Sequence, residues 1–305
     1  MQHTSHILMI KPVRFDFNTE TAVNNSFQVR SADTAIQEKA LAEFEAFIQT
    51  LRKNEIDVTV IEDSPHPHTP DSVFPNNWIS FHEDGTLILY PMFAENRRLE
   101  RKQNVIDVIH QKFRVGKTVD LSVFENKHLF LEGTGSMVLD RDNRIAYACL
   151  SPRTDKNILQ QFCDKTGYKP VSFCSVDDRE LVIYHTNVMM CVADQYVVIC
   201  LESIKDNEEK ARVRNSILQS GKQIIDISYD QMNRFAGNML QVHNKEGKIF
   251  LVMSSQAYDS LKEIQLKKLE SFNTIIHSDI STIEKNGGGS ARCMMAEVFL
   301  PLKTG

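Results

Sequence analysis

Hydrophobic and polar positions follow one recurring layout along the chain. Each repeat begins with an apolar run, a polar turn containing Asp, Asn or Gly, and a second apolar run, which is the pattern of a β-hairpin. A charged segment with apolar residues at helical spacing follows, and then a short strand rich in β-branched residues. The hairpins are predicted at WISFHEDGTLILYP (78–91), SMVLDRDNRIAYACLSP (136–152), VMMCVADQYVVICLES (188–203) and LQVHNKEGKIFLVMSS (240–255). The unit of strand, strand, helix and strand recurs roughly every 50 to 60 residues, a period typical of propellers and arrays.

The segments after the hairpins complete these units. Helical spacing is clear in RRLERKQNVIDVIHQKF (97–113) and SLKEIQLKKLESF (260–272). The closing strands are predicted in KTVDLSV (117–123), KPVSFCSV (169–176), KQIIDISY (222–229) and NTIIHSDIS (273–281).

A fifth unit is divided between the two ends of the chain. HILMIKPV (6–13), a helix in residues 35–54 and the strand IDVTVIED (56–63) supply all but its first strand, which we expect in CMMAEVFLP (293–301). Pairing of the N- and C-terminal strands would close the ring and remove exposed sheet edges. The predicted fold is α/β, a five-fold pseudosymmetric α/β propeller that forms a single domain over residues 1–305.

Composition and charge exclude several classes of protein. A formal net charge of −5 without a basic stretch argues against nucleic-acid binding. The most apolar stretch is interrupted by Asp194 and Gln195, so we expect neither a membrane span nor, from the N-terminal residues, a signal peptide. Six irregularly spaced cysteines without CxxC pairs predict reduced thiols and a cytoplasmic location. Five of them have apolar neighbours and are expected to be small core residues: Cys149, Cys163, Cys174, Cys191 and Cys200.

Candidate chemistry lies just before the first strand of each unit. The segments are PDSVFPNN (70–77), LEGTGS (131–136), YHTN (184–187), FAGN (235–238) and GGGSARC (287–293). Each polar residue alone also fits a turn, a cap or a core position. In a closed ring, however, they converge on one central cavity: Asp71, Asn76, Asn77, Glu132, His185, Asn187 and Cys293. A cysteine, a histidine and a carboxylate together are the composition of nucleophilic catalysis.

Two further features of these segments carry no predicted ligand. His66 and His68 lie in a Pro-rich stretch that favours a loop, and we predict neither a metal nor another cofactor. Asn238 is in register with the other inner residues, but the sequence assigns it no role.

These motifs resemble the guanidino-group-modifying enzymes, the pentein superfamily of arginine deiminases, dimethylarginine hydrolases and amidinotransferases. PDSVFPNNW is similar to the dimethylarginine-hydrolase signature PDxVFxED, and the resemblance extends over nearly the whole chain. It implies that Cys293 is the nucleophile, His185 the acid–base and Glu132 its carboxylate partner. CLSPRT (149–154) and PMFAENRR (91–98) resemble segments whose arginines hold the substrate carboxylate, which implies Arg153 and Arg97, with Arg98 as the alternative to Arg97.

Departures from those patterns bear on the substrate. The ED of the signature is Asn76-Asn77 here, and the deiminase pattern His-x-Asp becomes His185-Thr-Asn187. A buried guanidinium needs a carboxylate partner, whereas an amide can both donate to a ureido oxygen and accept from its NH2. The closest branch that the resemblance suggests is therefore the citrulline-utilisation hydrolase, or citrulline ureidase, which cleaves citrulline to ornithine, ammonia and carbon dioxide.

The expected mechanism follows from the weak electrophilicity of a ureido carbon. Cys293 would form an S-carbamoyl intermediate, with the oxyanion held by backbone N–H groups of Gly287–Gly289 or by the Asn77 amide. Asp71 would pair with the substrate ammonium, Arg153 and Arg97 would hold its carboxylate, and Asn76, Asn77 and Asn187 would surround its head group.

Alternatives stay open at this stage. An arginine deiminase or dimethylarginine hydrolase would release citrulline, an amidinotransferase would exclude water, and a non-enzymatic binding propeller would need no nucleophile. The expected partner is a small amino-acid substrate, and whether the chain forms a homodimer is left open.

Overall fold

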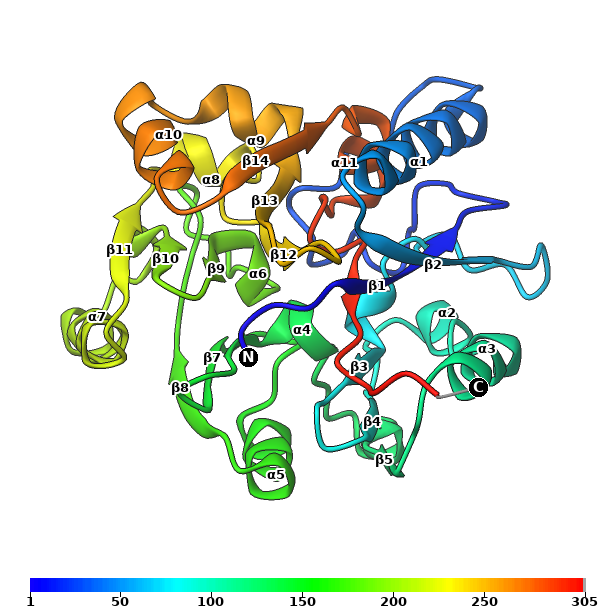
Figure 1. Ribbon diagram of the computed structural model, residues 1–305, viewed down its shortest axis with the longest axis horizontal. Coiled ribbons are helices and arrows are strands. Elements are labelled where there is room, and N and C mark those ends of the chain that lie inside the picture. The colour runs from blue at the N-terminus through cyan, green and yellow to red at the C-terminus, as the bar shows by residue number, and fades with distance from the viewer. Residues whose placement is uncertain (304–305) are drawn as a thin grey trace.

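The computed structural model describes residues 1–303 and contains five three-stranded sheets arranged around a common centre (Figure 1). The predicted five-fold α/β propeller is confirmed. The strands are β1 (His6–Lys11), β2 (Asp57–Glu62), β3 (Ile79–Phe81), β4 (Thr86–Leu89), β5 (Lys117–Asp120), β6 (Val138–Asp140), β7 (Ile145–Cys149), β8 (Lys169–Phe173), β9 (Met190–Val192), β10 (Tyr196–Ile199), β11 (Gln223–Asp226), β12 (Leu240–His243), β13 (Ile249–Ser254), β14 (Thr274–Ser278) and β15 (Ala296–Glu297).

Every sheet has the same topology. The middle strand pairs antiparallel with the first strand of its unit and parallel with the third, as in the order β3-β4-β5. The fifth sheet, β15-β1-β2, joins the two ends of the chain through the pairs Ile7↔Glu297 and Leu8↔Ala296. This pairing confirms the predicted closure of the ring. The closing strand is shorter than expected, because Cys293, Met294 and Met295 form or follow a turn before β15 begins.

Helices lie outside the sheets, and several short ones lie inside. Figure 1 shows α1, α3, α5, α7 and α10 on the rim and α4 and α6 near the centre. The helices are α1 (Ile36–Lys53), α2 (Glu95–Arg98), α3 (Gln103–Lys112), α4 (Gly133–Ser136), α5 (Lys156–Thr166), α6 (Thr186–Met189), α7 (Asn207–Gln219), α8 (Tyr229–Asn233), α9 (Ser255–Ser260), α10 (Glu263–Glu270) and α11 (Ser281–Gly287), with 3₁₀ turns η1 (Pro75–Asn77), η2 (Ser122–Lys127) and η3 (Leu201–Ser203).

Local signals explain where the rim helices begin and end. The Asp155 side chain caps α5 by accepting from the backbone N–H groups of Asn157 and Ile158, and Gly167 ends this helix with a φ of 75°. The single helix expected at 97–113 is wrong, because the chain breaks between α2 and α3. The break turns Arg97 and Glu100 inward, where both side chains are buried.

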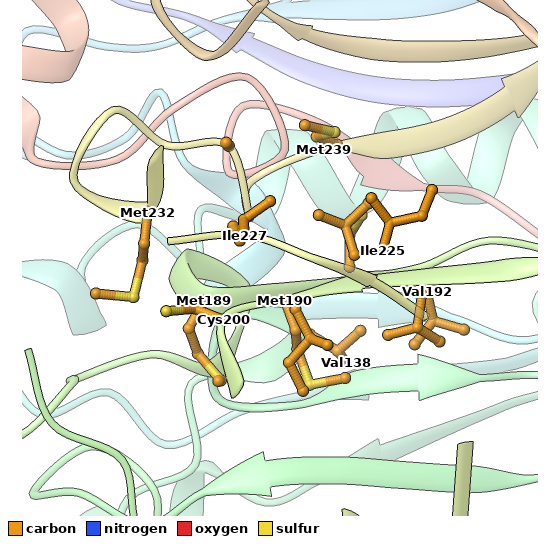
Figure 2. Close-up of a cluster of buried hydrophobic side chains, with 14 of the residues drawn as sticks. Val138, Met189, Met190, Val192, Cys200, Ile225, Ile227, Met232 and Met239 are labelled. Atoms are coloured by element: carbon orange, nitrogen blue, oxygen red, sulfur yellow. The ribbon is translucent and has the colours of Figure 1, made fainter. Parts of the chain in front are cut away.

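The hydrophobic core lies between neighbouring units. First strands of adjacent units pack against each other, as β15 does against β3 and β9 does against both β6 and β12. Figure 2 shows part of the largest apolar cluster, which combines Val138 of β6, Met190 of β9, Ile225 of β11 and Met239 just before β12. Because these residues come from three units, no unit buries its apolar face without its neighbours.

Two sequence-level expectations need comment here. Four of the five cysteines expected in the core are buried, but Cys174 is exposed because it follows the end of the outer strand β8. Among residues 1–303, no helix is long and apolar enough to cross a membrane.

Candidate active site

Five short segments converge at the centre of the ring, each directly before the first strand of its unit. They are η1, α4, α6, the turn 234–237 that precedes Asn238, and the turn 291–294. These segments and nearby loops enclose a narrow cavity of about 10 Å³, roughly the room of one water molecule. Its lining residues are Asn25, Asp71, Phe74, Asn77, Arg97, Arg153, Tyr184, His185, Gly287, Gly288, Gly289 and Cys293.

The Cys293 thiol is buried at one wall of this cavity, with 3% of the residue exposed. Its backbone N–H donates to the Ser290 carbonyl at 2.9 Å, which holds the turn before β15. Two side-chain amides reach the sulfur: Asn187 Nδ2 lies 3.4 Å and Asn238 Nδ2 3.3 Å from Sγ. Asn187, predicted to contact the substrate head, therefore contacts the thiol.

The three glycines before Cys293 allow close approach of neighbouring groups. A Cβ at Gly287 would lie 2.8 Å from the Phe74 ring, and a Cβ at Gly288, where φ is +65°, would lie 2.5 Å from Asn25 Nδ2. The Gly288 carbonyl accepts a hydrogen bond from the Tyr184 hydroxyl at 2.5 Å. Its N–H donates to the Glu284 carbonyl at 2.8 Å, so the expectation that the Gly288 amide holds an oxyanion is wrong.

His185 and Glu132 form a buried pair, with His185 Nε2 2.8 Å from Glu132 Oε2. Burial acts to raise the pKa of Glu132, but Arg153, whose Nη1 is 3.6 Å away, and the His185 hydrogen bond outweigh it and lower the pKa to about 2. Burial lowers the pKa of His185 to about 4, against the opposing effect of Glu132. The carboxylate accepts a hydrogen bond from Nε2–H. The neutral imidazole therefore carries its proton on Nε2, and its unprotonated Nδ1 can act as a base.

Asn77 is held by a charge pair behind it. Arg97 Nη1 donates to Asn77 Oδ1 at 2.8 Å, while Arg97 Nε and Nη2 donate to the two oxygens of Glu100 at 2.8 and 3.0 Å. Burial raises the pKa of the Glu100 carboxyl to about 7 against the opposing effect of Arg97. Protein acceptors thus occupy most N–H groups of Arg97. Arg98 is half-buried and donates to the carbonyls of Met92 and Phe93 instead, so Arg97 is the arginine at the cavity.

Asn76 is not among the residues that line the cavity. Its side chain is fully buried and donates to Thr134 Oγ1 at 3.3 Å, which ties η1 to α4. The expectation that Asn76 contacts the substrate is therefore not met by its position. This packing requires glycine at position 133, because φ is +47° there and a Cβ would collide with the Asn76 carbonyl.

The segment between β1 and α1 contacts the opposite end of the cavity. Asp71 Oδ2 accepts from Asn18 Nδ2 at 2.8 Å and from Thr21 Oγ1 at 3.1 Å. Arg153 Nε donates to Asn24 Oδ1 at 2.8 Å, and its Nη2 donates to the Thr21 carbonyl at 2.7 Å. Burial raises the pKa of Asp71, opposed by Arg97. The cavity as it stands is too small for an amino acid.

Sequence reasoning missed several of these contacts. Asn238 was in register with the other inner residues, and that signal could have placed it beside Cys293. Glu100 follows Arg97 by three residues, a spacing that brings two helical side chains together. No local signal marks Asn25 or Tyr184, whose contacts join segments far apart in the chain. Within residues 1–303, no group of three or more His, Cys, Asp or Glu side chains is arranged to hold a metal, and His66 and His68 are exposed.

A closed ring of five three-stranded units with a thiol, an imidazole and a carboxylate at its centre is the architecture of a pentein α/β propeller, and solved structures agree. ArgZ, an arginine dihydrolase from the ornithine–ammonia cycle in cyanobacteria, is 18% identical with a TM-score of 0.76, over 98% of this chain and 41% of ArgZ. The product-bound N-terminal domain of ArgZ is 19% identical with a TM-score of 0.74, over 97% of this chain and 98% of that domain. A dimethylarginine dimethylaminohydrolase variant in adduct with S-methyl-L-thiocitrulline is 17% identical with a TM-score of 0.64, over 97% of this chain and 100% of that chain.

The sequence model of the eukaryotic N,N-dimethylarginine dimethylhydrolase family matches residues 11–300, so the chain belongs to this family. It is accordingly a guanidino-modifying hydrolase that acts on carbon–nitrogen bonds. No curated protein sequence matches the chain. The chain spans about two fifths of full-length ArgZ. Because the relatives are named for arginine and dimethylarginine, the comparisons favour the arginine-type alternative over citrulline.

Proposed function

We propose that the chain hydrolyses the ureido group of citrulline, with Cys293 as nucleophile, His185 as acid–base and Glu132 as its positioning carboxylate. The products would be ornithine, ammonia and carbon dioxide. One observation carries the choice of citrulline: the unpaired side-chain N–H group that lines the cavity near His185 belongs to a neutral amide, that of Asn77.

The free donor belongs to Asn77. Its Oδ1 accepts from Arg97, which fixes the orientation of the amide and leaves Nδ2 on the other side, near His185. Within residues 1–303, Asn77 Nδ2 and Asn187 Oδ1 are buried without a hydrogen-bond partner. Asn77 lines the cavity, and a ureido group offers a carbonyl acceptor that can satisfy its Nδ2. A guanidinium offers donors only and would leave Asn77 Nδ2 unpaired, at a cost of roughly 1–3 kcal/mol.

Carboxylates are scarce at this end of the cavity. Glu132 is engaged by His185 at 2.8 Å and lies 3.6 Å from Arg153, and Glu100 is engaged by Arg97. Neither of these two carboxylates is therefore free to pair with a guanidinium head.

The reaction proceeds through two balanced steps. The Cys293 thiol proton passes to His185 Nδ1, and the sulfur attacks the ureido carbon. His185 returns the proton to the δ-nitrogen as the carbon–nitrogen bond breaks, so ornithine leaves and a carbamoyl group stays on sulfur. Water then attacks that carbonyl while His185 accepts its proton. The carbon–sulfur bond breaks, the thiol is reprotonated, and the released carbamic acid decomposes to ammonia and carbon dioxide.

The amino-acid end of the substrate fits the opposite end of the cavity. Asp71 Oδ1 is buried without a hydrogen-bond partner among residues 1–303 and could accept from the α-ammonium. Arg153 lines the cavity and is the better placed arginine for the carboxylate, because its hydrogen bonds to Asn24 and Thr21 are to neutral acceptors, whereas Arg97 is paired with the Glu100 carboxylate.

A second candidate is hydrolysis of arginine or a methylated arginine. It is supported by the family and by the solved relatives, among them an N-terminal domain of ArgZ covalently bound to a reaction intermediate and an AgrE variant bound to L-arginine. An arginine dihydrolase also makes ornithine, so the two candidates share the later hydrolytic step.

Product analysis separates these candidates. Purified protein is incubated separately with citrulline, arginine and N,N-dimethylarginine, and the products are identified by mass. Ornithine and one equivalent of ammonia from citrulline, with arginine unchanged, is the expected result. Release of citrulline from arginine or dimethylarginine, with citrulline itself unchanged, would refute the proposal. Cys293→Ser serves as the inactive control.

The choice between ureido and guanidino heads is tested by Asn77→Asp. One carboxylate oxygen would keep the hydrogen bond from Arg97, and the other would replace Nδ2 and face the ureido carbonyl. We expect kcat/KM for citrulline to fall by about 100-fold or more and arginine to become a tighter competitive inhibitor. Asn215→Asp, on the exposed face of α7, adds the same charge as a control. Unchanged citrulline kinetics in Asn77→Asp would show that Asn77 does not contact the substrate head.

A further inference from the structure

The fourth unit of the ring contributes the side chain of Asn238 to the centre. This residue follows the turn 234–237 and lies two residues before β12, whereas Glu132 and His185 come directly before the short helices α4 and α6 of their own units. It is fully buried, and its Nδ2 lies 3.3 Å from Cys293 Sγ. No part of the reaction described above uses it.

Neighbouring groups fix the orientation of the Asn238 amide. Its Oδ1 accepts from the backbone N–H of Arg292 at 3.0 Å, and its Nδ2 donates to the Asn187 carbonyl at 2.8 Å. A flipped amide would bring two N–H groups together on one side and two oxygens together on the other. Of the two amide atoms, Nδ2 is the nearer to Cys293 Sγ, at 3.3 Å, while Oδ1 lies 3.7 Å away and can accept from the neutral thiol.

Asn187 adds a second amide to the same sulfur, with its Nδ2 at 3.4 Å. Asn238 also positions this residue, because it holds the Asn187 carbonyl. The Cys293 sulfur thus lies against two side-chain N–H donors from two neighbouring units of the ring.

Charged groups near the thiol are mostly engaged elsewhere. Burial lowers the pKa of His185 to about 4, so this imidazole is neutral at pH 7. Arg292, the residue before the thiol, donates to Glu297 Oε2 at 2.6 Å. The other titratable groups that line the cavity are Asp71, Arg97, Arg153 and Tyr184.

We propose that Asn238 is a catalytic residue that, together with Asn187, binds the Cys293 sulfur as its thiolate through two amide N–H donors. This proposal rests on the proposed function only in that Cys293 is the nucleophile. Neutral donors would stabilise the negative sulfur without placing a cation beside the substrate head. A cation there would disfavour the positively charged imidazolium that forms when His185 takes the thiol proton.

The pH dependence of Cys293 alkylation tests this proposal without any substrate. Wild type, Asn238→Ala, Asn238→Asp and the control Asn233→Ala, at the exposed last residue of α8, are treated with iodoacetamide between pH 5 and 10. The modified peptide is identified by mass, because Cys174, unlike Cys293, is exposed and will react as well. Asn238→Asp keeps the shape and the acceptor for Arg292 but turns a donor into a negative charge. We expect the alkylation midpoint to rise by about one pH unit or more in Asn238→Asp, by less in Asn238→Ala, and not in Asn233→Ala.

Steady-state kinetics complete the test. The kcat for citrulline should fall by about 10-fold or more in both Asn238 variants, with a smaller change in KM. A wild-type midpoint in Asn238→Asp, measured on protein whose circular dichroism is unchanged, would overturn the proposal whatever the substrate is. A raised midpoint in a protein that does not hydrolyse citrulline would leave the amide pair standing and reject the proposed substrate.

Discussion

Three asparagine side chains border the Cys293 sulfur or the cavity in front of it. Each is oriented or held by a different neighbour: Asn77 by Arg97, Asn238 by Arg292 and Asn187 by Asn238. A fixed amide presents either a donor or an acceptor to a given point, whereas a carboxylate presents only acceptors. At the residue scale, the chemistry of the centre therefore depends on which neighbour holds each amide.

Gly135 is the residue-scale test of this arrangement. A Cβ there would lie 2.8 Å from His185 Nδ1 and closer still to Asn77 Nδ2, so it would displace both groups. We expect Gly135→Ala to lower kcat by about 100-fold, because small misplacements of reacting groups are costly. The free energy of unfolding should fall by only about 1–3 kcal/mol. In the control Gly116→Ala, the new Cβ is 3.6 Å from its nearest neighbour and should change neither quantity. Wild-type turnover in Gly135→Ala would mean that His185 and Asn77 tolerate displacement.

At the scale of secondary-structure elements, the site residues lie in or next to short inner segments rather than in long helices. η1, α4 and α6 each end where the first strand of a unit begins, so the sheets position them. The strands in turn depend on closure of the ring, where β1 pairs with only two residues of β15 in addition to its full pairing with β2. We call the junction of β1 and β15 the seam. Because it has so few backbone pairs, the apolar side chains packed there must supply much of the free energy that keeps the ring closed.

Leu8 tests the seam. It is fully buried, pairs in register with Ala296 on one side and Thr59 on the other, and belongs to the cluster between β1 and β3. We expect Leu8→Ala to lower the free energy of unfolding by about 2–5 kcal/mol in urea titrations. Lys11→Ala, in the same strand but with a partly exposed ion pair to Glu45, should cost less than about 1 kcal/mol. Similar losses in the two variants would argue that packing at the seam is loose.

Burial of the site at the middle of five units is a property of the whole molecule. His185 and Glu132 come from different units and are both removed from water only when the ring is closed. Desolvation then keeps His185 neutral, while Arg153 and His185 keep Glu132 ionised. The charge state that the proposed mechanism needs is thus a consequence of assembly.

Because these groups are buried, we expect the free energy of unfolding to fall at acidic pH. The pKa of His185 is about 4 in the folded chain, against 6.5 for an ordinary histidine. Between these values an unfolded chain binds the proton and the folded chain does not, so stability falls as the pH drops from 6.5 towards 4. The loss from His185 alone is up to about 3 kcal/mol. Glu132, with a pKa of about 2 against 4.5, adds a loss below pH 4.5.

The His185→Gln variant isolates this contribution. Glutamine does not titrate and can still donate to Glu132. We expect urea unfolding between pH 7.5 and 4.5 to show a flatter pH dependence in the variant than in wild type. Glu100 and Glu284, whose pKa values burial raises to about 7, act in the opposite direction but are common to both proteins. Parallel pH profiles would indicate that His185 is not kept neutral by the fold.

The sequence by itself determined the repeating unit, the closure of the ring and most of the residues that meet at its centre. The reason is that strand and helix periods are local, and that repetition places equivalent turns at equivalent positions. Cys293, His185, Glu132 and Asn77 could therefore be assigned to one place without coordinates.

Only the tertiary structure decided which of these side chains touch. Arg97 is engaged by Glu100, Asn76 turns to Thr134 rather than the cavity, and Asn238 reaches the thiol. The segment 12–35, which has no helix or strand, contacts Asp71 and Arg153 from more than 45 residues away. Such contacts join residues distant in sequence and depend on angles between packed units, which no local period encodes.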